Sequence, residues 1–75
     1  MSLPVLKPKQ LLSILRKAGW EVIRQKGSHI QLKHPDKESF RVTIPYHNED
    51  IAPGTLNSVI KQMGITKKQF EELLK

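Results

Sequence analysis

The chain contains no cysteine among its 75 residues, so neither a disulfide framework nor a thiolate nucleophile is available to it. A reducing compartment is therefore permitted but not demanded. No apolar run approaches the roughly 20 residues of a membrane-spanning helix, and the start lacks the hydrophobic region of a secretion signal. These absences predict a cytoplasmic protein without a membrane segment, whose stability comes from packing alone.

Acidic residues are also scarce, since 7 Asp and Glu stand against 13 Lys and Arg and the formal net charge is +6. Such an excess favours polyanionic partners, either nucleic acid or an acidic protein surface, although it can also serve solubility. A chain this short buries only about 60% of the surface that its unfolded form exposes, so the core must be small. We expect one domain over residues 1–75, with residues 1–6 as a flexible N-terminal segment.

Three stretches have the pattern of amphipathic helices. Apolar residues recur at helical spacing over about Pro8–Ala18, which predicts a first helix. The apolar positions of Leu56–Met63 predict a second helix that ends at Gly64. A short third helix is expected after Thr66, because Thr66 and Gln69 have the spacing of a capping box.

Between the first two helices the residues alternate as they do in strands. The sequence predicts strands over Trp20–Gln25, His29–His34 and Phe40–Ile44, joined by turns at 26–28 and 35–37. Short turns make neighbouring strands antiparallel. The order helix, three strands, helix, short helix predicts a two-layer α+β fold whose helices cover one face of the sheet and leave the other open.

The alternation predicts which side chains occupy the open face. If the apolar residues face the helices, the polar set on the other face is His29, Gln31, Lys33, Arg41 and Thr43. This surface suits a phosphate backbone, but polar outer faces are also ordinary in antiparallel sheets. The first strand is ambiguous, because Val22 and Ile23 are both apolar and point to opposite faces.

His29, directly after the Lys26-Gly27-Ser28 turn, is the candidate catalytic residue. A neutral imidazole can take a proton from a ribose 2′-hydroxyl and return one to a leaving oxygen without a metal. This combination in a basic domain points to RNA chemistry. The candidate phosphate-binding cations are Lys26, Lys33, Arg41 and, further, Arg24; each can equally be a solvated surface charge.

The other two histidines are expected to have different roles. His34 has the opposite parity to His29, so we expect it to pack at a strand end. His47 lies in the loop after the third strand, which antiparallel pairing returns towards His29, where it either shares acid and base duties or hydrogen-bonds the loop backbone. No metal site is expected, because the histidines lack zinc-motif spacing and only Glu49 and Asp50 lie close to His47.

Several short motifs occur in a specific order over nearly the whole chain. They are Leu11-Leu12 through Gly19-Trp20-Glu21, Gly27-Ser28-His29, Pro45-Tyr46-His47, Gly54-Thr55-Leu56, Ile60-Lys61-Gln62 and Gly64. In this order they resemble the HicA toxins of bacterial and archaeal toxin–antitoxin systems.

The resemblance implies a fold similar to a double-stranded RNA-binding domain and ribosome-independent cleavage of messenger RNA, with no cofactor and with inhibition by a HicB antitoxin. The catalytic histidine of the family falls on His29, and Gly27 and Ser28 match the turn that presents it. The family also has a histidine at His47, whose role the match leaves open. Two other interpretations are a non-catalytic RNA-binding module and a surface for an acidic protein partner.

Overall fold

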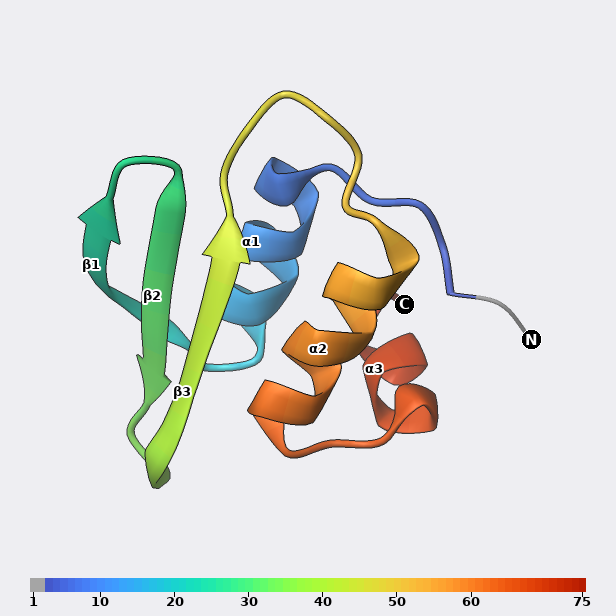
Figure 1. Ribbon diagram of the computed structural model, residues 1–75. Helices are drawn as coiled ribbons and strands as arrows, with labels where there is room; N and C mark the ends of the chain where they lie inside the picture. Colours follow the sequence, from blue (N-terminus) through green and yellow to red (C-terminus); the bar gives the residue numbers. More distant parts are fainter. Residues whose placement is uncertain (1–2) are drawn as a thin grey trace.

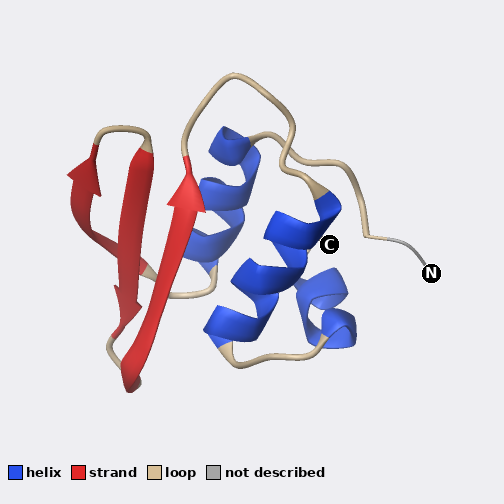
Figure 2. Cartoon of the chain, viewed as in Figure 1, coloured by secondary structure: helices blue, strands red, loops and turns tan. Residues whose placement is uncertain are grey.

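The computed structural model describes residues 3–75 as two packed layers (Figure 1). The elements are α1 (Pro8–Lys17), β1 (Glu21–Lys26), β2 (His29–His34), β3 (Lys37–Pro45), α2 (Pro53–Met63) and α3 (Lys67–Leu73). The strands form an antiparallel sheet in the order β1-β2-β3, and all three helices lie on one side of it (Figure 2). The predicted α+β class is confirmed, and the arrangement is compatible with a double-stranded RNA-binding-domain-like fold.

The predicted boundaries differ from the observed ones by a few residues. α1 ends one residue early, because Ala18 is its C-cap. β1 is displaced by one residue, and β2 has the predicted bounds. β3 begins at Lys37 rather than Phe40, since the turn before it takes only residues 35 and 36. α2 begins at Pro53, because proline suits the first turn of a helix, where its missing N–H costs nothing.

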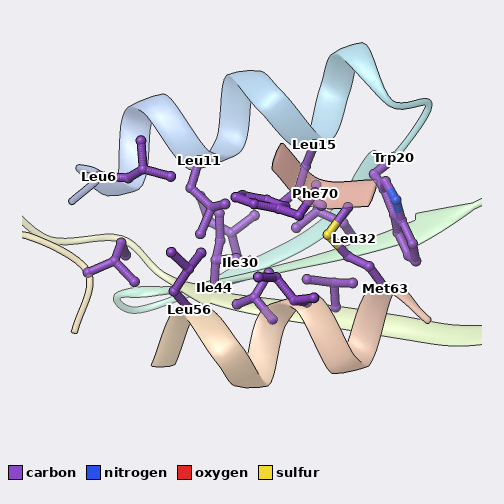
Figure 3. Close-up of a cluster of buried hydrophobic side chains, with 14 residues drawn as sticks. Leu6, Leu11, Leu15, Trp20, Ile30, Leu32, Ile44, Leu56, Met63 and Phe70 are labelled. Carbon is purple, nitrogen blue, oxygen red and sulfur yellow. The ribbon is translucent and has the colours of Figure 1, made fainter. Parts of the chain in front are cut away.

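The hydrophobic core lies between the sheet and the helices (Figure 3). Its buried residues are Leu6, Leu11, Leu15, Trp20, Ile30, Leu32, Val42, Ile44, Ile51, Leu56, Val59, Ile60, Met63 and Phe70. Within residues 3–75 no polar or charged residue is buried as a whole. The helix-facing side of β2 and β3 is therefore committed to packing, and functional side chains must come from the other side or from the loops.

The segment before α1 joins this core at its end. Of residues 1–6, which the sequence predicts to be flexible, residues 1–2 lie outside the described part of the chain. Leu6 is buried, and its carbonyl accepts a hydrogen bond from the Ile51 N–H at 2.7 Å. The last residue of the segment thus ties the start of α1 to the loop between β3 and α2.

The short helix α3 carries the predicted capping box. Thr66 Oγ1 accepts from the Gln69 N–H at 3.1 Å, and Gln69 Oε1 accepts from the Thr66 N–H at 2.8 Å. Such a cap contributes about 1 kcal/mol, and the fully buried Phe70 anchors the helix to the core.

Across residues 3–75, no helix has the length and apolar character needed to cross a bilayer.

Candidate functional site

A β-bulge in β1 determines which of its side chains reach the open face of the sheet. Val22 pairs with Leu32, but the next pair is Arg24 with Gln31, so Ile23 is an extra residue without a partner. Directly opposed residues in antiparallel strands point to the same face. Arg24 therefore lies on the open face beside Gln31, and the bulge resolves the ambiguity of the first strand.

The open face consists of three cross-strand rows. The histidine row is Lys26, His29 and Pro45; the middle row is Arg24, Gln31 and Thr43; the distal row is Glu21, Lys33 and Arg41. The predicted polar face is confirmed, and the fold brings every predicted RNA-contacting side chain onto it together with His29. Adjacent rows are about 7 Å apart, because two strand residues separate them. Lys26 and Arg24 are thus the nearest cations to His29 on this face.

The turn between β1 and β2 holds His29 at the end of a tight hairpin. Gly27 has a φ of 57° and Ser28 has a negative one, which is the pattern of a type II′ turn with glycine at its first central position. Lys26 and His29 are the pair that closes this turn. His29 consequently starts a regular strand rather than lying in a loose loop.

The His29 side chain is available for an outside partner. The residue is exposed, and among residues 3–75 nothing forms a hydrogen bond or ion pair with its ring. Directly opposite lies Lys26, at a Cβ separation of about 5 Å that is typical of cross-strand pairs. An imidazole with both nitrogens free and an ammonium group beside it can exchange protons with, and neutralise charge on, a bound phosphodiester.

The loop after β3 returns to His29, as predicted. Pro45 pairs with His29, and the Tyr46 N–H donates to the Ser28 carbonyl. His47 follows in this exposed loop, and its Nδ1 accepts a hydrogen bond from the Glu49 N–H at 3.1 Å. The structure therefore shows the backbone bond that was one of the two interpretations of His47, while its Nε2 has no partner within the described residues.

His34, at the other end of β2, is engaged with the fold. Its Nδ1 accepts from the Asp36 N–H at 3.1 Å, so the neutral ring carries its proton on Nε2, which lies 3.0 Å from the Ala18 carbonyl oxygen. The ring also meets Trp20 edge to face, with 5.3 Å between centroids. The prediction that His34 packs at a strand end is confirmed.

The distal row is expected to attract an anion less strongly than the other two rows. Arg41 Nη1 donates to the carbonyls of Glu38 and Phe40 at 2.6 and 2.8 Å, which directs the guanidinium along its own strand. Glu21, Glu38, Lys33 and Arg41 line one shallow cavity of about 540 Å³. Because carboxylates share this cavity with the cations, its positive potential is reduced.

Sequence reasoning did not identify Lys7. Its Nζ lies 3.0 Å from Asp50 Oδ1 and donates to the Asn48 carbonyl at 3.2 Å, linking the start of α1 to the loop that carries His47. No local pattern signals a contact between residues more than 40 positions apart.

In residues 3–75 no group of three or more His, Asp or Glu side chains is placed to hold a metal ion.

The comparisons with known proteins agree with the motif order. A family model described as the HicA toxin of bacterial toxin–antitoxin matches residues 8–65. No curated protein matches the chain. The matched range contains α1, the whole sheet and α2, and it leaves out Lys7 and α3.

Proposed function

Because the chain belongs to the HicA toxin family and is the toxin of a toxin–antitoxin system, we propose that it is an endoribonuclease that cleaves messenger RNA without the ribosome and without a metal. The observation that supports this best is His29, exposed and free of hydrogen bonds within residues 3–75, opposite Lys26. RNA carries its own nucleophile, the 2′-hydroxyl, so a proton carrier beside a cation is a sufficient minimal site.

The proposed reaction is an internal transfer at phosphorus. Neutral His29 takes the proton of a 2′-hydroxyl, and the oxygen forms a bond to the adjacent phosphorus. The bond from phosphorus to the 5′-oxygen breaks, and the imidazolium returns the proton to that leaving oxygen. The products are a 2′,3′-cyclic phosphate and a 5′-hydroxyl. Proton transfer of this kind contributes about 10²–10⁴-fold to the rate.

The remaining acceleration comes from binding and charge. Lys26, in the row of His29, is the residue proposed to stabilise the charge that develops on the phosphate. Arg24 and Gln31, one row further, extend the path of the RNA backbone, and Lys33 and Arg41 continue it at the distal end. Gly27 and Ser28 assist by holding the turn that presents His29.

The family implies a HicB-type antitoxin as partner, and we propose that it binds the same surface. A HicB-type protein that covers the open face of the sheet would separate His29 from RNA without changing the toxin fold. The basic rows of this face suit a partner with acidic residues, since complementary charge speeds association.

The test is cleavage of a long single-stranded RNA in excess EDTA by the parent and by His29→Ala. We expect the parent to leave cyclic phosphate ends and the variant to bind RNA without cutting it, with both proteins folded by circular dichroism. Equal cleavage by the two proteins would exclude His29 as the catalytic residue. Binding without cleavage by both would favour a non-catalytic RNA-binding module, which the compatible fold also permits. Cleavage only after a metal is restored would contradict metal independence.

A further inference from the structure

The loop of residues 46–52, here called the His47 loop, is anchored at both of its ends. At its start the Tyr46 N–H donates to the carbonyl of Ser28, the residue before His29. At its end Ile51 is buried in the core, and its N–H donates to the Leu6 carbonyl at 2.7 Å. In Figure 1 this loop, drawn in yellow, arches from β3 past the start of α1. Its course is therefore set by the hairpin on one side and by the segment before α1 on the other.

Lys7 holds the middle of the His47 loop. Its Nζ contacts both the Asp50 carboxylate and the Asn48 carbonyl, at 3.0 and 3.2 Å. The Lys7 backbone is itself fixed, because its N–H donates to Gln10 Oε1 at 2.8 Å at the N-terminus of α1. One ammonium group thus connects a helix start to the two residues that flank Glu49, whose N–H binds His47.

The hydrogen bond to His47 determines the chemistry of its ring. Nδ1 accepts from the Glu49 N–H, so it carries no proton, and the neutral ring has its proton on Nε2. A second proton on Nδ1 would set two N–H donors against each other and break the bond. In the observed loop conformation His47 is consequently a hydrogen-bond donor through Nε2 and is not suited to pass protons.

His34 shows what such a donor does when an acceptor is present. It has the same local arrangement, with Nδ1 accepting from the N–H two residues later, and its Nε2 is paired with the Ala18 carbonyl oxygen at 3.0 Å. His47 repeats the arrangement next to the histidine row, where Nε2 finds no acceptor within residues 3–75. Because His47 is exposed, this N–H is open to an outside acceptor, and the negatively charged oxygens of RNA are the strongest acceptors that this surface would meet.

We infer that His47 binds a non-bridging phosphate oxygen of the RNA through Nε2–H, that Lys7 is the positioning residue which holds it there, and that His29 alone carries the protons. This assignment rests on the proposed function for the identity of the ligand. It gives a role to His47, which the motif pattern leaves open. Removal of His47 weakens RNA binding, whereas removal of His29 stops the reaction.

The first test needs neither RNA nor activity. Ring ¹⁵N spectra of the free protein at a pH where His47 is neutral should show the proton on Nε2. The Lys7→Met variant should show exchange between the two tautomers. A proton on Nδ1 in the parent would overturn the assignment of His47, and an unchanged spectrum in Lys7→Met would overturn that of Lys7.

The second test separates binding from turnover. His47→Ala should raise KM about tenfold with little change in kcat, since a hydrogen bond to a charged group is lost. His47→Gln, which keeps an N–H donor, should recover part of the loss. A large fall in kcat for His47→Ala with an unchanged KM would make His47 a proton carrier and contradict the inference.

Lys7→Met should raise KM about two- to fivefold, because a half-exposed ion pair contributes little by itself. Lys7→Arg should restore the parent value. Lys9→Met, the same change of charge two positions later in the chain, is the matched control and should leave KM unchanged. Equal effects of Lys7→Met and Lys9→Met would show that Lys7 acts only through its positive charge. That result would overturn its positioning role. If the parent cuts no RNA, the proposed function is wrong, and RNA affinities of the same variants then replace KM.

Discussion

The two ends of β2 carry one histidine each, and they use it in opposite ways. At the end of the strand, both His34 nitrogens are engaged by the backbone at Asp36 and Ala18, and the ring packs on Trp20. At the start of the strand, His29 has no such partner among the described residues. The residue type is the same and the strand is the same. The difference shows that the surroundings of a histidine, rather than its presence, identify the candidate for chemistry.

The rest of each end follows the same division. Near His34, Lys37 Nζ donates to the Met63 carbonyl at 2.9 Å and lies 5.7 Å from the centre of the Phe40 ring. That ring covers Gly64, where a Cβ atom would collide with it. Near His29, Lys26 lies exposed on the open face without such contacts inside residues 3–75. The side chains at the His34 end pack against the fold, whereas those at the His29 end are exposed.

The largest expected effect is a loss of cleavage when His29, at the start of β2, is replaced. His29→Ala should lower the cleavage rate by about 10²–10⁴-fold, because the proton carrier is lost. Its unfolding free energy should stay within about 0.5 kcal/mol of the parent value, since the side chain is exposed. Single-turnover cleavage and urea unfolding measure the two quantities. A substantial loss of stability would show that His29 also supports the fold.

Gly19 lies against His34, and Gly27 lies in the turn before His29. Replacing Gly19 should cost more unfolding free energy than replacing Gly27. Gly19→Ala should cost about 3 kcal/mol of unfolding free energy, because φ is 98° and the added Cβ would lie 2.6 Å from His34 Nε2. Gly27→Ala should cost about 1 kcal/mol, since φ is 57° but no heavy atom lies within 4 Å of the added Cβ. Urea unfolding of both variants checks the order. Equal costs would show that the closed end has no special packing.

His34→Ala should have the converse effect of His29→Ala. It should lower the unfolding free energy by about 2 kcal/mol, because a part-buried carbonyl loses its donor and Trp20 loses a ring contact. At a temperature where the variant is folded, its cleavage rate should remain within about twofold of the parent rate, because His34 lies at the opposite end of β2 from His29. A strong loss of turnover in the folded variant would mean that the two ends are coupled.

The smallest expected effects compare two lysines of the open face. Lys26→Met, in the histidine row, should lower kcat/KM about tenfold, whereas Lys33→Met, in the distal row, should lower it about threefold. The two variants lose the same charge, so only position distinguishes them. Cleavage rates at fixed ionic strength supply the measurement. Equal losses would indicate a diffuse electrostatic contribution instead of a local one at His29.

The elements that follow local rules could be predicted from the sequence. The period of α1, the alternation of β2 and the capping box of α3 all depend on neighbours within four residues, and each was predicted correctly. The open face of β2 and β3 followed from the same alternation. His29 could also be proposed as catalytic, since its position after a glycine turn is visible in the chain; its role stays a prediction.

Other features depend on tertiary structure and left no local signal. The bulge at Ile23 is a property of pairing between two strands, so β1 could not be assigned to a face beforehand. The contact of Lys7 with Asp50 joins distant segments. The hydrogen bond from Glu49 that sets the tautomer of His47 depends on the shape of the loop. Strand parity distinguished His34 from His29 in the sequence, whereas the hydrogen bond that orients His47 is visible only in the fold.

The bulge at Ile23 also bears on whether the protein stays dispersed. β1 is an outer strand, and a long regular outer strand is a template on which another chain can add a strand and begin aggregation. The extra residue interrupts the ladder and increases the local twist, and Arg24 and Lys26 place two positive charges on the same strand. A second copy therefore meets an irregular strand instead of a regular ladder. The same inserted residue that places Arg24 on the open face therefore also makes β1 a poorer template for strand addition.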